Sequence, residues 1–392
     1  ETYLMNNMLR VDSKTSQECC GCTACVVSCP FGAIKMIPDE LGFKYPLIDN
    51  DLCTNCGKCF KDCQFTTTYK VFNNLEEPLI YAARLKDEEK LSQSQSGGAF
   101  SAIAETILAQ GGIVYGVSYS KNFKVNHCKV TNIDALNSIK GSKYVQSNLD
   151  RIFIDVINEL KNNKLVLFSG VPCQVENLRK QTERIKTGKL VTIDILCHGV
   201  GAPKIWEDYL HYLEKKHSSP LQKVNMRDKL LGWRGGIETY IFNNKKKIIT
   251  ESYLYLYFSH FIQRESCYNC PYTNLKRVGD ISLGDFWHWE ETVHKEFRDN
   301  KGISLMFINS SIGKTLFNEA SNMLDIIPSN TKECMQNVLR HSIQPNIKRK
   351  NFLKDYKQNG FKYVAHKYGD LGYIYKIKIF IAKKLSTIKQ KL

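Results

Sequence analysis

The sequence predicts a small α+β module joined to a larger α/β body, and three observations support this. Nine of the 15 cysteines fall between positions 19 and 63, which is typical of a compact metal-bearing module. Beyond position 71 cysteines become sparse and β-prone segments alternate with helical ones, a pattern typical of an α/β fold with a mixed, partly parallel sheet. A hydrophobic fraction of 43% and a charged fraction of 24% are ordinary for a globular protein and exclude wholesale disorder.

Within the module, the run C-x2-C-x2-C-x3-C occurs twice. Three cysteines at this spacing wrap three corners of a cubane, and the helix that follows carries the fourth away to the other cluster. We therefore predict a bacterial-type ferredoxin with two interlocked [4Fe-4S] clusters. One cluster is assigned to Cys19, Cys22, Cys25 and Cys63, and the other to Cys53, Cys56, Cys59 and Cys29.

The alternative for these runs is a pair of zinc sites, because C-x2-C knuckles also bind zinc. A structural zinc site is complete with four ligands, however, so zinc binding does not require two runs of this spacing. Cys20 fits neither run and is interpreted as a bystander thiol. Between the runs, β-prone residues 33–37 and 45–48 flank a turn at 39–42, which predicts the hairpin of the ferredoxin layout.

The body offers a further group of cysteines. Residues 164–168 and 190–196 are predicted parallel strands, and Cys173 and Cys197 follow them at the strand ends, where open α/β sheets collect ligands. A later loop supplies a C-x2-C pair, Cys267 and Cys270. Together the four predict a third [4Fe-4S] cluster. The alternatives are cysteines that act as small buried hydrophobes, a zinc site, or redox-active thiols.

Another candidate site lies at Ser96, Gly97 and Gly98, which precede a helical stretch over residues 99–110. A serine–glycine turn that opens a helix presents free backbone N–H groups and the positive end of the helix dipole, which is a usual seat for phosphate. Helix capping by the serine explains the same residues equally well.

The body carries further motifs in a fixed order, and as a set they are specific. They are SGG at 96–98, KGSKYVQS at 140–147, FSGVPCQ at 168–174, CHGV at 197–200, RDK at 227–229, GW at 232–233 and DISLGDFW at 280–287. With the C-x2-C pair, this set resembles the beta subunit of the coenzyme factor-420 hydrogenase/dehydrogenase family. The resemblance spans residues 81–309.

That resemblance implies a flavin-binding α/β body, in which FAD exchanges a hydride with a deazaflavin coenzyme as substrate and one-electron steps link the flavin to the clusters. The implied flavin contacts are Ser96, Gly97, Gly98, Ser142, Lys143, Tyr144, Gln146 and Ser147. His198 is the implied catalytic proton donor or a flavin contact. A surface lysine is the alternative for Lys143, and a structural histidine is the alternative for His198.

These patterns divide the chain into four parts. They are a two-cluster ferredoxin domain (1–72), a flavin-binding first part of the body (73–186), a second part with the C-x2-C pair (187–345) and a basic tail (346–392). The leading interpretation is an oxidoreductase that moves electrons between a redox partner protein or ferredoxin and a small-molecule two-electron donor or acceptor. The alternative is a non-catalytic electron-transfer subunit that serves a separate enzyme.

Most of the net charge of +16 lies in the tail, where residues 346–392 contain twelve lysines and one arginine against two aspartates. Residues 371–392 predict a basic amphipathic helix, either packed on the body or held at an anionic inner membrane face. The tail shows no groove-reading motif, so nucleic acid is not an expected partner. No apolar run reaches the roughly 18 residues of a membrane span. The cysteine pattern and the lack of a secretory signal at the start predict a cytoplasmic protein.

Overall fold

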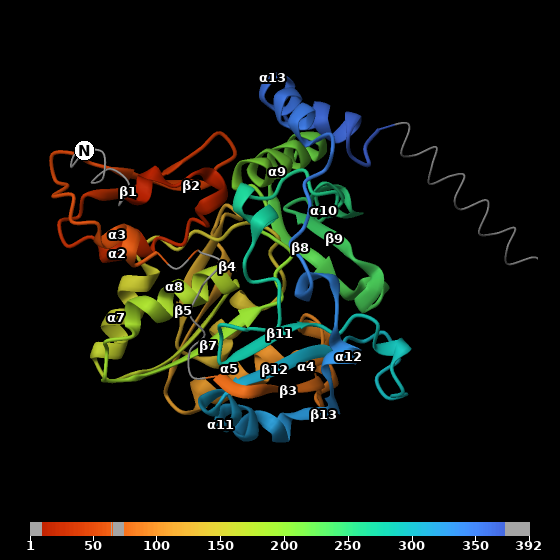
Figure 1. Cartoon of the computed structure of the whole chain (residues 1–392). Coiled ribbons are helices and arrows are strands. Elements are labelled where there is room, and N and C mark those ends of the chain that lie inside the picture. The colour runs from red at the N-terminus through yellow and green to blue at the C-terminus, as the bar shows by residue number, and fades with distance from the viewer. Residues whose placement is uncertain (1–9, 64, 66–73, 373–392) are drawn as a thin grey trace, which may run out of the picture.

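The computed structural model describes residues 10–63, 65 and 74–372, and Figure 1 shows a small module beside a larger body. The module contains helices α2 (Ala24–Ser28) and α3 (Lys58–Lys61) and an antiparallel hairpin of β1 (Ile34–Pro38) and β2 (Lys44–Ile48). The hairpin turns because Asp39 Oδ1 accepts hydrogen bonds from the backbone N–H groups of Leu41 and Phe43, at 2.9 and 2.8 Å. The hairpin predicted from the sequence is confirmed.

The body is built on an eight-stranded sheet in the order β13-β3-β12-β11-β7-β6-β4-β5. The central pairs β11 with β7, β7 with β6, and β6 with β4 are parallel, and the outer pairs are antiparallel. The mixed, partly parallel sheet predicted from the sequence is confirmed. Its strands are β3 (Asn74–Leu85), β4 (Ile113–Tyr119), β5 (Val125–Val130), β6 (Leu165–Gly170), β7 (Lys189–Ile195), β11 (Ile281–Asp285), β12 (Ser304–Ser310) and β13 (Leu324–Ser329).

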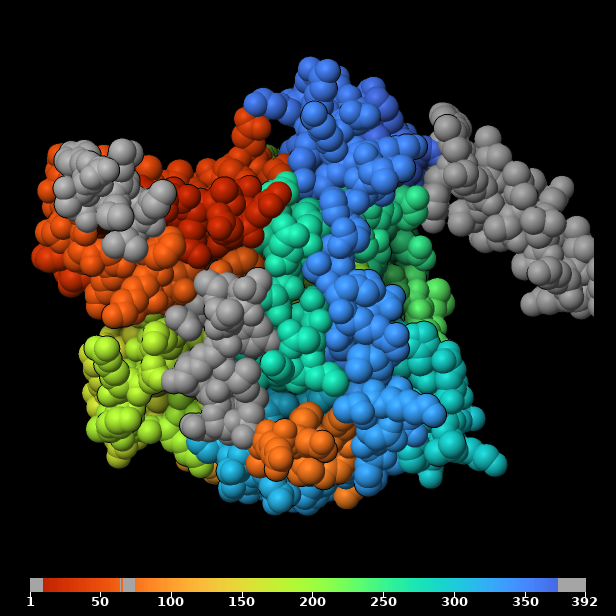
Figure 2. Space-filling view, viewed as in Figure 1, coloured from red at the N-terminus to blue at the C-terminus, as the bar shows by residue number. Residues whose placement is uncertain are grey.

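Helices cover both faces of this sheet (Figure 1). Alternate residues of a strand point to opposite faces, so Leu167 of β6 packs with α5 (Ala99–Ala109) and α11 (Ser311–Ala320). Its neighbours Val166 and Phe168 pack on the other face with α7 (Ile152–Lys161) and α8 (Pro172–Thr182). Because α2 of the module also contacts α7 and α8, the module sits on that second face. Figure 2 shows the module and this part of the body forming one continuous surface.

A second, three-stranded antiparallel sheet packs beside the first. It contains β8 (Leu221–Asp228), β9 (Ile237–Phe242) and β10 (Lys247–Thr250), and its helices are α9 (Pro203–His217), α10 (Ser252–Phe258) and α13 (Arg349–Lys367). An aromatic core joins these elements, with Trp206, Tyr209, Tyr240 and Tyr253 fully buried. The remaining α-helices are short: α4 (Glu88–Gln93), α6 (Ile133–Leu136) and α12 (Thr331–Cys334).

Glu238 gives this aromatic core a pH dependence that can be measured. Its carboxylate accepts hydrogen bonds from the N–H of Leu254 (2.7 Å) and the hydroxyl of Tyr240 (2.5 Å), and burial raises its pKa from 4.5 to about 8. The folded state therefore keeps a proton that the unfolded chain loses above pH 4.5. The contribution of Glu238 to stability should be greatest below that pH and fall up to about pH 8, by roughly 1.4 kcal/mol per pH unit.

Thermal unfolding of anaerobic protein between pH 5 and 9 checks this expectation. Glu238→Gln, which cannot ionise, should flatten the decline of the unfolding midpoint with pH. A decline of equal slope in Glu238→Gln would assign the pH dependence to other groups.

Between residues 10 and 372, leaving out 64 and 66–73, no helix has both the length and the apolarity that crossing a bilayer requires. The amphipathic helix predicted for 371–392 lies outside the described residues beyond position 372, and it stays a prediction.

Candidate functional site

The first thiol group, around the start of α2, consists of Cys19, Cys22, Cys25 and Cys63. Burial raises the pKa of Cys25, and the neighbouring thiols of Cys19 and Cys63 raise it further. Left-handed backbone at Gly21 (φ 69°) and Thr23 (φ 67°) lets the loop turn tightly into the helix. The structure thus brings Cys63, from the second run, to the loop cysteines of the first, and ligation by these four stays a prediction.

The second thiol group is the set predicted to hold the second cluster, Cys29, Cys53, Cys56 and Cys59, and ligation by these four stays a prediction. Burial raises the pKa of Cys59, and the nearby thiols of Cys29 and Cys53 raise it by a smaller amount. These three side chains pack with Val11, Ile34 and Ile48, so they share one apolar shell. Cys56 is exposed and does not belong to that shell.

The body thiol group is Cys173, Cys197, Cys267 and Cys270, and all four line one cavity. Cys173 lies in the first turn of α8 after β6, and Cys197 follows β7. Cys267 lies within a single turn at residues 265–269, and Cys270 directly follows that turn. Burial raises the pKa of Cys197 to about 12 and that of Cys270 to about 11. In the described part of the chain, no group of three or more His, Cys, Asp or Glu side chains is close enough to hold a single metal ion.

A buried ion pair holds the two halves of the body thiol group together. Asp194 of β7 accepts hydrogen bonds from Arg277 Nη2 (2.8 Å) and from the N–H groups of Val278 (3.1 Å) and Gly279 (3.0 Å). Arg277 also donates to the carbonyl of Tyr272 at 2.9 Å, in the loop after Cys270. The strand end that carries Cys197 and the C-x2-C loop are therefore fixed to each other. No local pattern in the sequence indicates this ion pair.

Cys20 lies between the module and the body, although the sequence indicated only a bystander. Hydrogen bonds with the thiols of Cys173 and Cys22 lower its pKa, and the same contact with Cys20 raises the pKa of Cys173. Cys20 therefore contacts one member of the first thiol group and one of the body thiol group. The only feature of the sequence that points to this contact is that Cys20 directly follows Cys19.

A large cavity of about 620 Å³ adjoins the body thiol group. The predicted flavin contacts that line it are Ser96, Gly98, Ser142, Lys143, Tyr144 and Ser147, together with His198. Gly97 and Gln146 do not line it. Gly97 packs against β3, where an added Cβ would lie 2.2 Å from the carbonyl oxygen of Ala83. Gln146 instead donates to the carbonyl of Cys20 at 2.9 Å.

The serine–glycine turn at this cavity differs from the expectation of free backbone N–H groups. Ser304 Oγ accepts from the N–H of Gly97 (3.0 Å) and of Ala99 (3.4 Å), and the N–H of Gly98 donates to the carbonyl of Gln95 (3.1 Å). The serine partner comes from β12, more than 200 residues away, and the local sequence could not indicate it. These three N–H groups are therefore already hydrogen-bonded within the protein.

Cations line the cavity. Lys143 Nζ donates to the carbonyls of Lys140 (2.8 Å) and Gly141 (3.3 Å), and burial lowers its pKa to about 8. Arg227 is buried and forms an ion pair with Asp285. Its guanidinium carbon lies 5.0 Å from the ring centroid of Trp287. In the sequence, Arg227 is part of the motif RDK, and that motif by itself indicates no role for it.

His198 lines both cavities, so it lies where they meet. Its Nε2 is 2.9 Å from Nε2 of His260, whose Nδ1 lies 2.8 Å from the carbonyl oxygen of Gln344. Burial, followed by the charge of His260, lowers the pKa of His198 to about 4. The ring is consequently neutral at pH 7.

Comparisons with known protein families agree with this arrangement. Residues 18–67 match a 4Fe-4S dicluster domain, residues 80–153 match "Coenzyme F420 hydrogenase/dehydrogenase, beta subunit N-term", and residues 163–332 match the C terminus of the same subunit. The fold, the thiol groups and the matches together define a 4Fe-4S dicluster domain joined to a mixed α/β body. The chain belongs to the coenzyme F420 hydrogenase/dehydrogenase beta subunit family.

Two individual proteins are similar. The coenzyme F420-dependent sulfite reductase of Methanocaldococcus jannaschii is 26% identical over 245 residues, which cover 58% of this chain and 37% of that protein. The chain thus matches little more than a third of the length of this relative. A chain of the F420-reducing [NiFe] hydrogenase complex from Methanosarcina barkeri aligns at 17% identity with a TM-score of 0.45, covering 74% of this chain and 90% of that one.

Proposed function

We propose that this chain is an iron–sulfur flavoprotein oxidoreductase that couples one-electron transfer through [4Fe-4S] clusters to two-electron chemistry at FAD. One observation carries the proposal: the cavity lined by the body thiol group and the large cavity share a wall, formed by residues 197–200, Val171 and Val338. A cluster in the first cavity would therefore border a cofactor in the second. When bound, FAD converts between two-electron and one-electron transfer.

The residues around the large cavity fit such a cofactor. Its volume of about 620 Å³ is within the usual range of ligand sites, roughly 300–1,000 Å³. Lys143 supplies a cation for a pyrophosphate, since in the described chain its ammonium group has two carbonyl partners and no ion pair with a carboxylate. Trp287 stacks on Trp233 at a centroid distance of 4.8 Å and adds a flat aromatic wall.

Three further polar side chains around the cavity, Arg227, Asp285 and His198, would orient the cofactor. Arg227 and Asp285 neutralise each other and hold the two tryptophans, because Asp285 also accepts from Trp233 Nε1 at 2.7 Å. Neutral His198 can donate or accept one hydrogen bond at the shared wall without placing a charge between the two cofactors. Family membership suggests a deazaflavin coenzyme as the two-electron partner, and a ferredoxin or other redox protein as the one-electron partner.

A second candidate function is a non-catalytic electron-transfer subunit. The observation that favours it is the match of residues 18–67 to a 4Fe-4S dicluster domain, because clusters alone can pass electrons to a partner without substrate chemistry. In this reading, the chain delivers electrons to a separate catalytic protein. The flavin content of the protein distinguishes the two functions.

We expect anaerobically purified protein to release about one FAD per chain on denaturation. Lys143→Met should weaken FAD binding by roughly 10- to 100-fold, because a hydrogen bond to a charged group contributes about 1.5–3 kcal/mol. Released flavin fluorescence after FAD titration measures this, with iron content as the check on folding. Lys121→Met, on the exposed turn after β4, is the matched control and should bind as the original protein does.

Protein that retains iron and never binds FAD would refute the flavoprotein proposal and favour the electron-transfer subunit. FAD binding that is equal in Lys143→Met and Lys121→Met would refute the role of Lys143 alone.

A further inference from the structure

We infer that Arg264 is the internal counter-charge of the cluster assigned to the first thiol group, and that it fixes this cluster against the body. The inference rests on the proposed [4Fe-4S] ligation by Cys19, Cys22, Cys25 and Cys63, and not on flavin binding. Arg264 belongs to the body, and no sequence motif drew attention to it.

The guanidinium group of Arg264 is fully buried at the junction, with 0% of the residue exposed. Its Nε donates to the carbonyl of Cys19 at 2.8 Å, and Nη2 donates to the carbonyl of Lys44 at 3.0 Å. Nη1 donates to Gln146 Oε1 at 2.9 Å. Two of these acceptors, Cys19 and Lys44, belong to the module, so Arg264 reaches from the body into the module.

The fourth contact gives the arginine its electrostatic role. Nη2 lies 3.6 Å from the sulfur of Cys19, a predicted ligand of the first cluster. Within the described residues Arg264 forms no ion pair with a carboxylate, and its neighbour Glu265 pairs with Arg349 instead. The acceptors of Arg264 are therefore neutral groups and one cysteine sulfur.

A buried guanidinium without a counter-ion would carry a large desolvation cost. A [4Fe-4S] cluster with four thiolate ligands is an anion, and it gains one more negative charge on reduction. A fixed cation beside a ligand sulfur stabilises the reduced state more than the oxidised state. Arg264 should therefore raise the reduction potential of this cluster.

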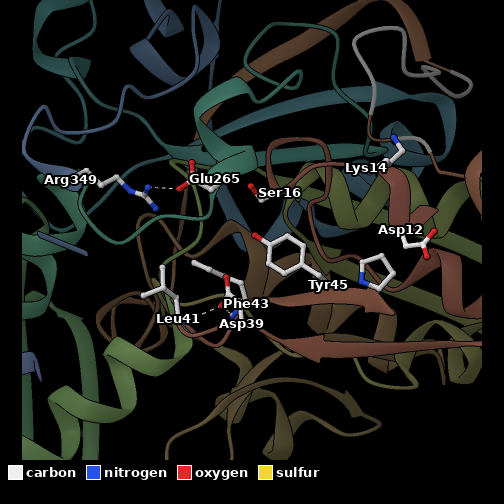
Figure 3. Close-up of a pocket in the computed structure, with 10 residues that line it drawn as sticks. Asp12, Lys14, Ser16, Asp39, Leu41, Phe43, Tyr45, Glu265 and Arg349 are labelled. Carbon is white, nitrogen blue, oxygen red and sulfur yellow. Dashed lines mark hydrogen bonds and ion pairs between the residues drawn. The ribbon is translucent and has the colours of Figure 1, made fainter. Parts of the chain in front are cut away.

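The surroundings keep water from screening this interaction. The guanidinium lies 4.1 Å from the ring centroid of Tyr45 and 5.4 Å from that of Phe43. Gly21 allows the close approach, because an added Cβ would lie 2.9 Å from Arg264 Nη1. Figure 3 shows the ring of Tyr45 in a cleft of about 430 Å³ at the junction, with the Arg349–Glu265 pair on the side of the body.

The backbone of Arg264 connects the same position to the body thiol group. Its N–H donates to the carbonyl of Val200 (3.1 Å), and its carbonyl accepts from the N–H of Cys267 (3.0 Å). One residue thus holds a ligand of the first predicted cluster with its side chain and a ligand of the third with its main chain. Electron transfer between these two clusters would cross this contact.

The test is a redox titration of the full chain, followed by EPR, for Arg264→Gln, Arg264→Lys and the original protein. We expect Arg264→Gln to lower the potential of one of the two module clusters and to leave the other unchanged, since no hydrogen bond between described residues joins Arg264 to the second thiol group. Arg264→Lys keeps the charge but loses the planar fork, so its shift should be smaller and in the same direction. Arg349→Gln is the matched control.

Arg349 is a buried arginine at the same junction with no hydrogen bond to a cysteine, so its replacement should leave both module potentials in place. Unchanged potentials in Arg264→Gln with full iron content would overturn the inference, as would an equal shift in Arg349→Gln. If Arg264→Gln loses the first cluster, Arg264→Lys decides: retention of the first cluster in Arg264→Lys supports the role of the charge, and loss of the cluster from both variants overturns it. A protein with both module clusters and no flavin would refute the flavoprotein proposal without affecting this result.

Discussion

Replacing Cys267 and Cys270 together with serine should lower the iron content from about twelve to about eight per chain, because three [4Fe-4S] clusters would become two. Serine is a poor ligand for this cluster, and the two residues supply half of the body thiol group. Iron and acid-labile sulfide analysis of anaerobically reconstituted protein measures the loss, and EPR of the reduced protein shows whether the module signals persist.

Cys128→Ser is the matched control, since Cys128 lies on β5 and does not line the cavity of the body thiol group. It should leave the iron content unchanged. Loss of zinc in place of iron from the double variant would show that the body site is a zinc site. Unchanged iron would remove Cys267 and Cys270 from the ligand set.

The parts of this architecture that local patterns determine could be predicted from the sequence. The hairpin of the module follows from β-prone residues around Asp39, whose carboxylate bonds the turn. The parallel pair β6 and β7 follows from two apolar runs that each lead into a helix or loop. Because parallel strands end at one edge of a sheet, Cys173 and Cys197 could be expected to meet.

The parts that sequence reasoning missed depend on contacts between residues far apart in the chain. Arg264 contacts Cys19 across a separation of 245 residues, and Ser304 occupies the N–H groups of the serine–glycine turn from 207 and 205 residues away. Gln146, predicted as a flavin contact, faces the module because its partner Cys20 arrives from another domain. No local periodicity encodes such pairs.

The junction also explains why Cys20 looked like a bystander. In the sequence, Cys20 interrupts a run of predicted cluster ligands but does not match the spacing of that run. In the fold, the run lies against the body, and the extra thiol fills the contact between Cys22 and Cys173. Its role depends on docking of the module, which the spacing of the cysteines does not predict.

Asp194→Ala should destabilise the body by about 3–5 kcal/mol, because it leaves the guanidinium of Arg277 buried without its carboxylate. The side chains of Arg277 and Asp194 are only 2% and 0% exposed, so water cannot replace the lost partner. The N–H groups of Val278 and Gly279 lose their acceptor as well. Anaerobic urea unfolding of the full chain measures the change in the free energy of unfolding.

Two further variants separate the ion pair from a general effect of substitution. Asp155→Ala, at an exposed position of α7, should change stability by no more than about 0.5 kcal/mol. Adding Arg277→Met to Asp194→Ala should recover part of the loss, since replacing both charges removes the buried guanidinium that has lost its carboxylate. Because the pair ties the strand end at Cys197 to the loop of Cys267 and Cys270, Asp194→Ala should also lose the third cluster more readily than the two in the module. Equal retention of all three clusters would show that the pair stabilises the fold without positioning the body thiol group.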